Sequence, residues 1–92
     1  MMNDNNNAKL TISNEIIISE IGNDNYVLNI ETGKYLKLNN SSMFILNKIK
    51  DKKSEDEIVK LIIDEFKINY SQAVSDLKLF IEKATKLKII KN

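Results

Sequence analysis

The chain contains no cysteine and no histidine. Without cysteine, disulfides, thiolate nucleophiles and cysteine-ligated metal sites are excluded, and without histidine the commonest general base and zinc ligand are missing. The remaining carboxylates come in adjacent pairs, such as Asp64 and Glu65, which point in different directions on a helix and cannot form an acid–base dyad. We therefore expect a protein that is not an enzyme and that holds neither a metal nor a cofactor.

Arginine is absent as well, because all 14 basic residues are lysines. Arginine is the usual bidentate reader of guanine, so its absence weakens the case for sequence-specific DNA binding. A net charge of +1 gives equally little support to non-specific binding. Lysines are nevertheless concentrated after Asp76. This basic segment is typical either of a solvated helix face or of a surface that attracts an acidic peptide.

Long hydrophobic runs are missing too. No stretch approaches the ~20 apolar residues of a membrane span, and the N-terminus lacks the apolar core of a signal peptide. With 92 residues there is room for one domain. Residues 1–8 have no apolar pattern, so we expect a disordered tail there. The predicted arrangement is this tail followed by one cytoplasmic domain over residues 9–92.

The stretch from residue 26 to residue 39 predicts a β-hairpin. Its first half places Tyr26, Leu28 and Ile30 on the apolar face of a half-buried strand, and Leu36 and Leu38 alternate in the same way in the second half. The turn between them contains Gly33, whose missing Cβ permits the positive φ that a short hairpin turn needs.

A further strand is expected before this hairpin. Ile16, Ile17 and Ile18 in succession indicate high β propensity, and Gly22 begins a turn into the hairpin. Residues 9–13 are a candidate for one more strand or for a cover over the core. The sequence thus predicts three antiparallel strands in meander order, with the third strand at an edge of the sheet.

Three helices are expected after the sheet. The first covers residues 40–50 and is capped by Asn40, Ser41 or Ser42. Ser54 and Glu57 form a capping-box pattern that begins the second. The third runs from a Ser71 cap to about Leu87. Its apolar positions share one face, which we expect to be buried: Ala73, Val74, Leu77, Phe80, Ile81, Ala84 and Leu87.

Leu79 falls on the polar side of the third helix. Single exposed leucines are common and usually have no function. Beside a peptide-binding groove, however, such a residue is a natural anchor for an apolar side chain. Both interpretations are open from the sequence alone.

The order and spacing of several short motifs resemble the PqqD-like family. These motifs are Tyr35-Leu36-Lys37-Leu38-Asn39, Ile45-Leu46, the helix led by Ser54, Asp76-Leu77, Phe80-Ile81 and Ile89-Ile90, and together they cover about residues 15–91. Members of this family are RiPP recognition elements, which bind the leader segment of a ribosomally made precursor peptide for a modifying enzyme. The resemblance implies an α+β fold like a winged helix-turn-helix, with a three-stranded antiparallel sheet followed by three helices.

The resemblance also implies a binding mode and a site. The leader would pair with the edge strand by β-augmentation and lie against the third helix. Apolar leader side chains would contact Tyr35, Leu79 and Phe80, while Lys37 and Lys83 would pair with leader carboxylates. The whole implied site is Lys34, Tyr35, Leu36, Lys37 and Leu38 on the strand and Asp76, Leu79, Phe80 and Lys83 on the helix.

Two positions depart from the family pattern. Lys88 stands where a glycine commonly ends the third helix, and Ala84 stands where a larger apolar residue is common. These departures bear on where the helix ends and on how deep the groove is.

The resemblance implies a stand-alone adaptor that presents the precursor peptide to a separate maturation enzyme, either a leader peptidase of a lasso-peptide pathway or a radical-SAM enzyme. Three alternatives remain open. The domain could be a winged-helix DNA-binding protein, although Asp76 and Glu82 lie on its supposed recognition helix. It could be a subunit that only stabilises a larger enzyme. The edge lysines, Lys34 and Lys37, could serve only to discourage aggregation.

Overall fold

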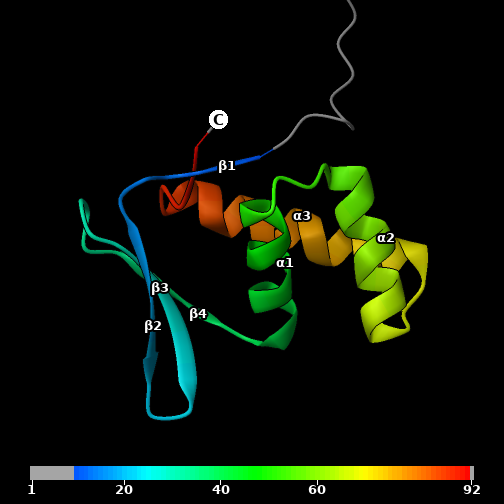
Figure 1. The fold of residues 1–92 in the computed structure, drawn as a ribbon, viewed down its shortest axis with the longest axis horizontal. Helices are drawn as coiled ribbons and strands as arrows, with labels where there is room; N and C mark the ends of the chain where they lie inside the picture. The colour runs from blue at the N-terminus through cyan, green and yellow to red at the C-terminus, as the bar shows by residue number, and fades with distance from the viewer. Residues whose placement is uncertain (1–9, 92) are drawn as a thin grey trace, which may run out of the picture.

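The computed structural model describes residues 10–91. They form an α+β domain in which a three-stranded antiparallel sheet precedes three helices (Figure 1). The fold expected from the sequence is thus confirmed in class and element order. The expected tail at residues 1–8 lies outside the described residues. The elements are β1 (Thr11–Ile12), β2 (Ile16–Ile21), β3 (Asp24–Asn29), β4 (Tyr35–Leu38), α1 (Asn40–Lys50), α2 (Glu55–Phe66), α3 (Tyr70–Lys86) and β5 (Ile90–Lys91).

The main sheet has the strand order β2-β3-β4. Ile21 pairs with Asp24, so Gly22 and Asn23 form a two-residue turn, and Gly22 has φ +64°. Gly33 in the second turn has φ +78°. A residue with a Cβ is strained at such angles, which explains why glycine stands in both turns. The meander and the conformation of Gly33 agree with the sequence analysis.

A second, two-stranded sheet joins the two ends of the domain. Thr11 pairs with Lys91 and Ile12 with Ile90, in antiparallel register. The amide of Ser13 also donates to the carbonyl of Ile89 over 2.9 Å. The sequence suggested a strand near residues 9–13, but it gave no sign of the partner strand β5.

The prediction for the buried face of β3 was wrong. The buried side chains are Val27 and Asn29, whereas Tyr26 and Leu28 are half-buried and Ile30 is 51% exposed. Alternation alone predicted the opposite face, because it assigns apolar residues to the buried side and therefore places an asparagine on the exposed side. On β4 the prediction holds, since Leu38 is buried and Leu36 packs against the core.

Asn29 is buried because each end of its side chain has hydrogen-bond partners. Its Oδ1 accepts from the amides of Glu31 (2.9 Å) and Thr32 (3.1 Å) in the hairpin turn. Its Nδ2 donates to the carbonyls of Lys88 (2.9 Å) and Leu87 (3.4 Å), just after α3. Buried amides are tolerated where they are satisfied in this way. The hairpin and the end of α3 are thereby held together.

The helix caps confirm one prediction and correct two. Ser54 and Glu57 form the expected capping box of α2, with bonds of 2.8 and 3.2 Å. The cap of α1 is Asn39 and not one of residues 40–42. The cap of α3 is Asn69 and not Ser71. In both corrected cases an asparagine directly precedes the helix and accepts from the third backbone amide beyond it.

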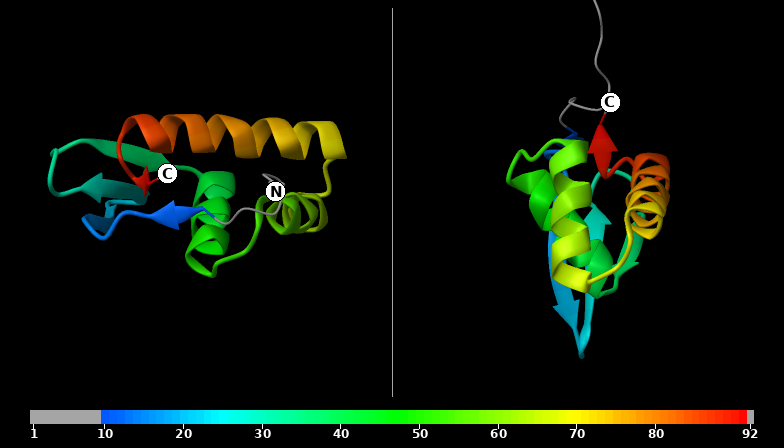
Figure 2. Two further views of the ribbon diagram at one scale, coloured as in Figure 1. Left: turned by 90° about the horizontal axis from the view of Figure 1, so that it is seen from above. Right: turned by 90° about the vertical axis from the view of Figure 1, so that its right-hand side faces the viewer.

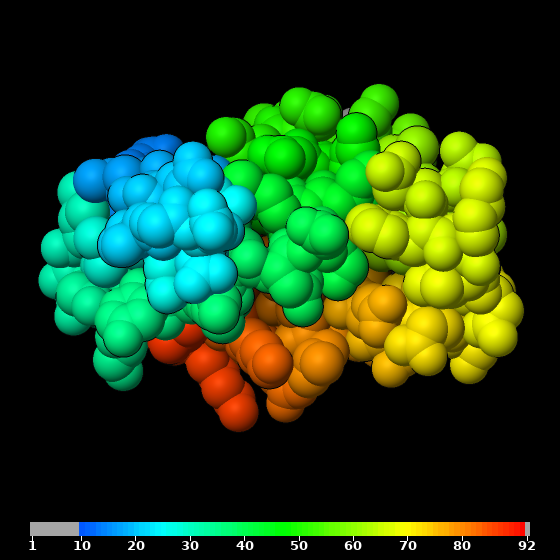
Figure 3. Space-filling model, turned by 90° about the horizontal axis from the view of Figure 1, so that it is seen from below, coloured from blue at the N-terminus to red at the C-terminus, as the bar shows by residue number. Residues whose placement is uncertain are grey.

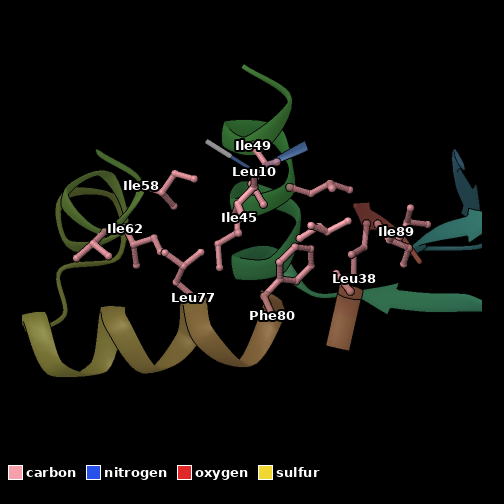
Figure 4. Close-up of a cluster of buried hydrophobic side chains, with 14 of the residues drawn as sticks. Leu10, Leu38, Ile45, Ile49, Ile58, Ile62, Leu77, Phe80 and Ile89 are labelled. Atoms are coloured by element: carbon pink, nitrogen blue, oxygen red, sulfur yellow. The ribbon is translucent and has the colours of Figure 1, made fainter. Parts of the chain in front are cut away.

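The core lies mainly between the three helices and extends to the sheet at Leu38, as Figure 4 shows. In Figure 2, α3 runs along one side of the molecule past α1 and α2. The expected inner face of α3 is confirmed, with Ala73, Leu77, Phe80 and Ala84 buried. No helix among residues 10–91 has the length and apolar character to cross a membrane.

The Asn29 interactions lead to a prediction for stability. Replacing Asn29 by alanine removes its hydrogen bonds to the carbonyl of Lys88 and to two turn amides, and each such bond contributes about 0.5–1.5 kcal/mol to stability. We expect Asn29→Ala to lower the free energy of unfolding in urea by about 2–4 kcal/mol. The control is Asn47→Ala on the exposed side of α1. Equal stability of the two variants would contradict the structural role of Asn29.

Lys88 supplies a second prediction. Its φ of +61° is left-handed, and its amide donates to the carbonyl of Thr85 as α3 ends. Glycine adopts this conformation without strain, so Lys88→Gly should raise the free energy of unfolding by about 0.5–1 kcal/mol. Lys86→Gly, inside the last turn of α3, should lower it. A loss of stability with Lys88→Gly would show that the lysine side chain itself stabilises the helix end.

Candidate functional site

A groove runs between β4, the start of α1 and α3. Its volume is about 160 Å³. On the face shown in Figure 3, the first turns of α1 (green) meet the middle of α3 (orange) beside the sheet. The groove is lined by Leu36, Lys37, Asn39, Ser41, Ser42, Ile45, Asp76, Leu79, Phe80 and Lys83.

The direct connection between β4 and α1 positions two walls of the groove. β4 ends at Leu38, Asn39 is already the helix cap, and α1 begins at Asn40. The Asn39 side chain accepts from the Ser42 amide over 2.8 Å, and the Ser42 hydroxyl accepts from the Asn39 amide over 2.8 Å. These reciprocal bonds fix the angle between the strand and the helix.

The third wall comes from α3. Asp76, Leu79, Phe80 and Lys83 are spaced so that they follow one another along a single helix face. Phe80 is 4% exposed and reaches into the core, whereas Leu79 is 51% exposed at the rim. The wall is therefore apolar at its base and has a charged residue at each end.

Six of the nine predicted site residues line this groove. They are Leu36, Lys37, Asp76, Leu79, Phe80 and Lys83. The structure does not bring the other three to it. The side chain of Leu38 lies in the core, and Lys34 lies in the turn, where its carbonyl accepts from the Asn29 amide over 2.8 Å.

Tyr35 lies on the opposite face of the sheet from the groove. It is 65% exposed, pairs with Leu28, and packs edge-on against Tyr26 with ring centroids 5.8 Å apart. The expected contact of Tyr35 with the same leader side chains as Leu79 and Phe80 does not fit this placement. Alternation along β4 places Tyr35 and Leu36 on different faces, so Tyr35 would meet other side chains of a peptide.

Four lining residues were not among the predicted site residues, and all of them lie between the end of β4 and the second turn of α1. Ile45 is only 1% exposed, yet it forms part of the base of the groove. Asn39, Ser41 and Ser42 were considered only as possible caps or as the end of the strand. The sequence did offer a signal for them, because they start a predicted helix directly after a predicted edge strand. The unpaired backbone amides at a helix start attract polar or anionic groups.

The outer edge of β4 has open backbone groups. The Asn29 amide donates to the Lys34 carbonyl, so the even-numbered residues of β4 direct their backbone groups toward β3. In an antiparallel pair the direction alternates, so Tyr35 and Lys37 direct their N–H and C=O groups away from the sheet. No other strand of residues 10–91 pairs with this edge.

The charges around the groove are mostly positive. Lys37 Nζ lies 3.6 Å from Asp24 Oδ1, on the exposed face of the sheet. Lys83 forms no ion pair within residues 10–91, and Asp76 Oδ1 accepts from Gln72 Nε2 over 2.7 Å. Lys83 is therefore the better candidate for pairing with a carboxylate in the groove.

One carboxyl group of the described residues, that of Glu55, has a clearly shifted pKa. Burial and the neighbouring Asp56 raise the pKa of Glu55, partly offset by Lys78, but Glu55 does not line the groove. Within residues 10–91 no group of three or more aspartate or glutamate side chains is arranged to hold a metal ion.

Comparison with known proteins establishes the family. Residues 25–90 match the family model described as coenzyme PQQ synthesis protein D (PqqD). The chain belongs to the PqqD family. The matched stretch includes every wall of the groove, and it begins after β2. No curated protein sequence matches the chain.

Two solved structures share the PqqD fold of this chain. One, TbiB1 in complex with the TbiA(beta) leader peptide, has a TM-score of 0.79 and 22% identity, and the alignment covers 89% of this chain and 95% of TbiB1. The other, lasso peptide synthetase B1 complexed with the leader peptide, has a TM-score of 0.81 and 16% identity. That alignment covers 92% of this chain and 100% of the synthetase chain.

Proposed function

We propose that the protein binds the leader segment of a ribosomally synthesised precursor peptide and presents it to a separate maturation enzyme. The observation that carries this proposal is the open edge of β4 directly beside a groove. An extended peptide paired with such an edge gains backbone hydrogen bonds, while neighbouring pockets select its side chains. Membership of the PqqD family and the two leader-bound structures of the same fold support this function.

The backbone of Tyr35 and Lys37 supplies the pairing groups in this proposal. Both residues direct their N–H and C=O groups toward the open side of β4. A guest strand there extends the sheet to four strands. Its side chains alternate between the two faces, so one row enters the groove and the other emerges on the exposed face beside Tyr35.

Each row meets a different environment. In the groove, Leu36, Ile45, Leu79 and Phe80 favour apolar leader side chains. Lys83 and the start of α1 favour a leader carboxylate at the rim. On the exposed face, Ile17, Leu28 and Tyr35 are neighbours across the three strands and offer a further apolar surface.

The role that we assign is non-catalytic. The leader is held as a strand with the following residues of the precursor left free, so that an enzyme bound to the same precursor carries out the chemistry. We place this activity in the cytoplasm, where ribosomal peptides are made. The partner is a lasso-peptide leader peptidase or a radical-SAM enzyme; the fold shared with a lasso peptide synthetase B1 supports the first of these.

The groove contacts can be tested at Leu79. Leu79→Asp places a charge where an apolar side chain is to be buried, and Leu79 is exposed enough that the fold tolerates the change. We expect the dissociation constant for the leader segment of the precursor peptide to rise about tenfold or more in isothermal titration calorimetry. The control is Tyr70→Asp, an exposed position of α3 outside the groove. Normal binding by Leu79→Asp would contradict our assignment of the groove.

Backbone pairing can be tested at Lys37. Proline there removes an N–H group that faces the open edge and that β3 does not use, so Lys37→Pro should leave the domain folded. We expect it to weaken leader binding about tenfold. Lys37→Ala removes the same side chain but keeps the N–H group, and it should weaken binding far less. Equal affinities of the two variants would rule out β-augmentation at this edge.

A further inference from the structure

The sheet has a second open edge, which the proposed leader site does not use. β2 pairs with β3 on one side, and no other strand of residues 10–91 pairs with its outer side. The Ile30 amide donates to the Glu15 carbonyl over 2.8 Å, so odd-numbered residues near β2 direct their backbone groups toward β3. By alternation, Ile16, Ile18 and Glu20 direct theirs outward. Lysine and proline, which commonly protect such edges, do not occur in β2.

A hollow of about 550 Å³ borders this edge. Ile16 and Ile18 of β2 form one side of it, together with Ile12 of β1 and Ile49 of α1. Lys50 and Lys52 at the end of α1 form its basic rim. The edge therefore fits an extended segment whose side chains facing the hollow are apolar, with one acidic side chain among them to pair with the lysines.

We propose that this segment is β2 of a second copy of the protein, and that the two copies pair through β2 in antiparallel register about a two-fold axis. The pairing joins the two sheets into one continuous sheet. Each copy presents the same surface to the other, as a closed symmetric dimer requires.

The sequence of β2 is complementary to itself in this register. With the two-fold axis at Ile18, each Ile18 lies opposite its counterpart, and Ile16 lies opposite Glu20 of the second copy. All outward backbone groups of the three residues then have partners. Side chains opposite each other in antiparallel strands are close enough to interact, so Glu20 of the second copy lies beside Ile16, which lines the hollow together with Lys50 and Lys52.

This dimer leaves the proposed leader site free. β2 and β4 are the opposite edges of the sheet, with β3 between them. β2 also lies outside residues 25–90, the stretch that matches the PqqD model and contains every wall of the groove. The contact is small, and interfaces of limited area are generally weak, so we expect association in the micromolar range.

Sedimentation equilibrium over a wide concentration range, with the full chain and no leader peptide, tests the dimer. We expect a monomer–dimer equilibrium that Glu20→Lys weakens about tenfold, because two modest ion pairs become two repulsions. Lys50→Glu with Lys52→Glu should weaken it similarly, and the triple variant should restore the wild-type dissociation constant. Glu82→Lys on α3 is the control for charge alone.

Hydrogen exchange then locates the contact. The amides of Ile16, Ile18 and Glu20 should become more protected as protein concentration rises, and this protection should disappear in Glu20→Lys. Three results would overturn the proposal: a monomer at every concentration, protection confined to other residues, or no restoration in the triple variant. Because no leader is present, a failure here is independent of leader binding.

Discussion

The alternating direction of backbone groups along an antiparallel strand controls what this small sheet can bind. Half of the N–H and C=O groups of each outer strand point to β3, and the other half point away from the sheet. On β4 the outward groups lie beside the groove formed with α1 and α3. On β2 they lie beside a hollow that combines isoleucines with lysines. The same alternation thus leaves both edges of the sheet with open backbone groups, and the side chains beside each edge distinguish the segments that the two edges fit.

Hydrogen bonds of Asn29 join the hairpin to the end of α3, so two walls of the groove are linked outside the groove itself. Asn29 contacts the hairpin turn and the carbonyls of Leu87 and Lys88, which follow the last turn of α3 just beyond the groove residue Lys83. The positive φ of Lys88 turns the chain so that these carbonyls face Asn29. Lys88 therefore adopts the left-handed conformation that the family resemblance associates with a glycine at this position. Ala84 is fully buried and does not line the groove.

The sequence predicted those features that local patterns determine. The capping box at Ser54, the glycine turns and the apolar face of α3 each depend on residues close together in the chain, and all three are present. Asn29 was assigned to the wrong face because its burial depends on carbonyls almost sixty residues away. β5 was missed for the same reason, since two residues become a strand only through β1. The groove was predicted in outline through family resemblance. That outline grouped Tyr35 with Leu79 and Phe80, although alternation along β4 already places Tyr35 and the groove residue Leu36 on opposite faces of the sheet.

Because no loop separates β4 from α1, the protein and a bound peptide lose very different amounts of conformational entropy when they associate. Asn39 serves as the residue after the strand and as the helix cap, so the receiving surface has little freedom to lose when a guest strand arrives. Nearly all of the conformational entropy lost on association then belongs to the guest. Among peptides with the same contacting side chains, those whose free chains already favour extended conformations should be retained longest.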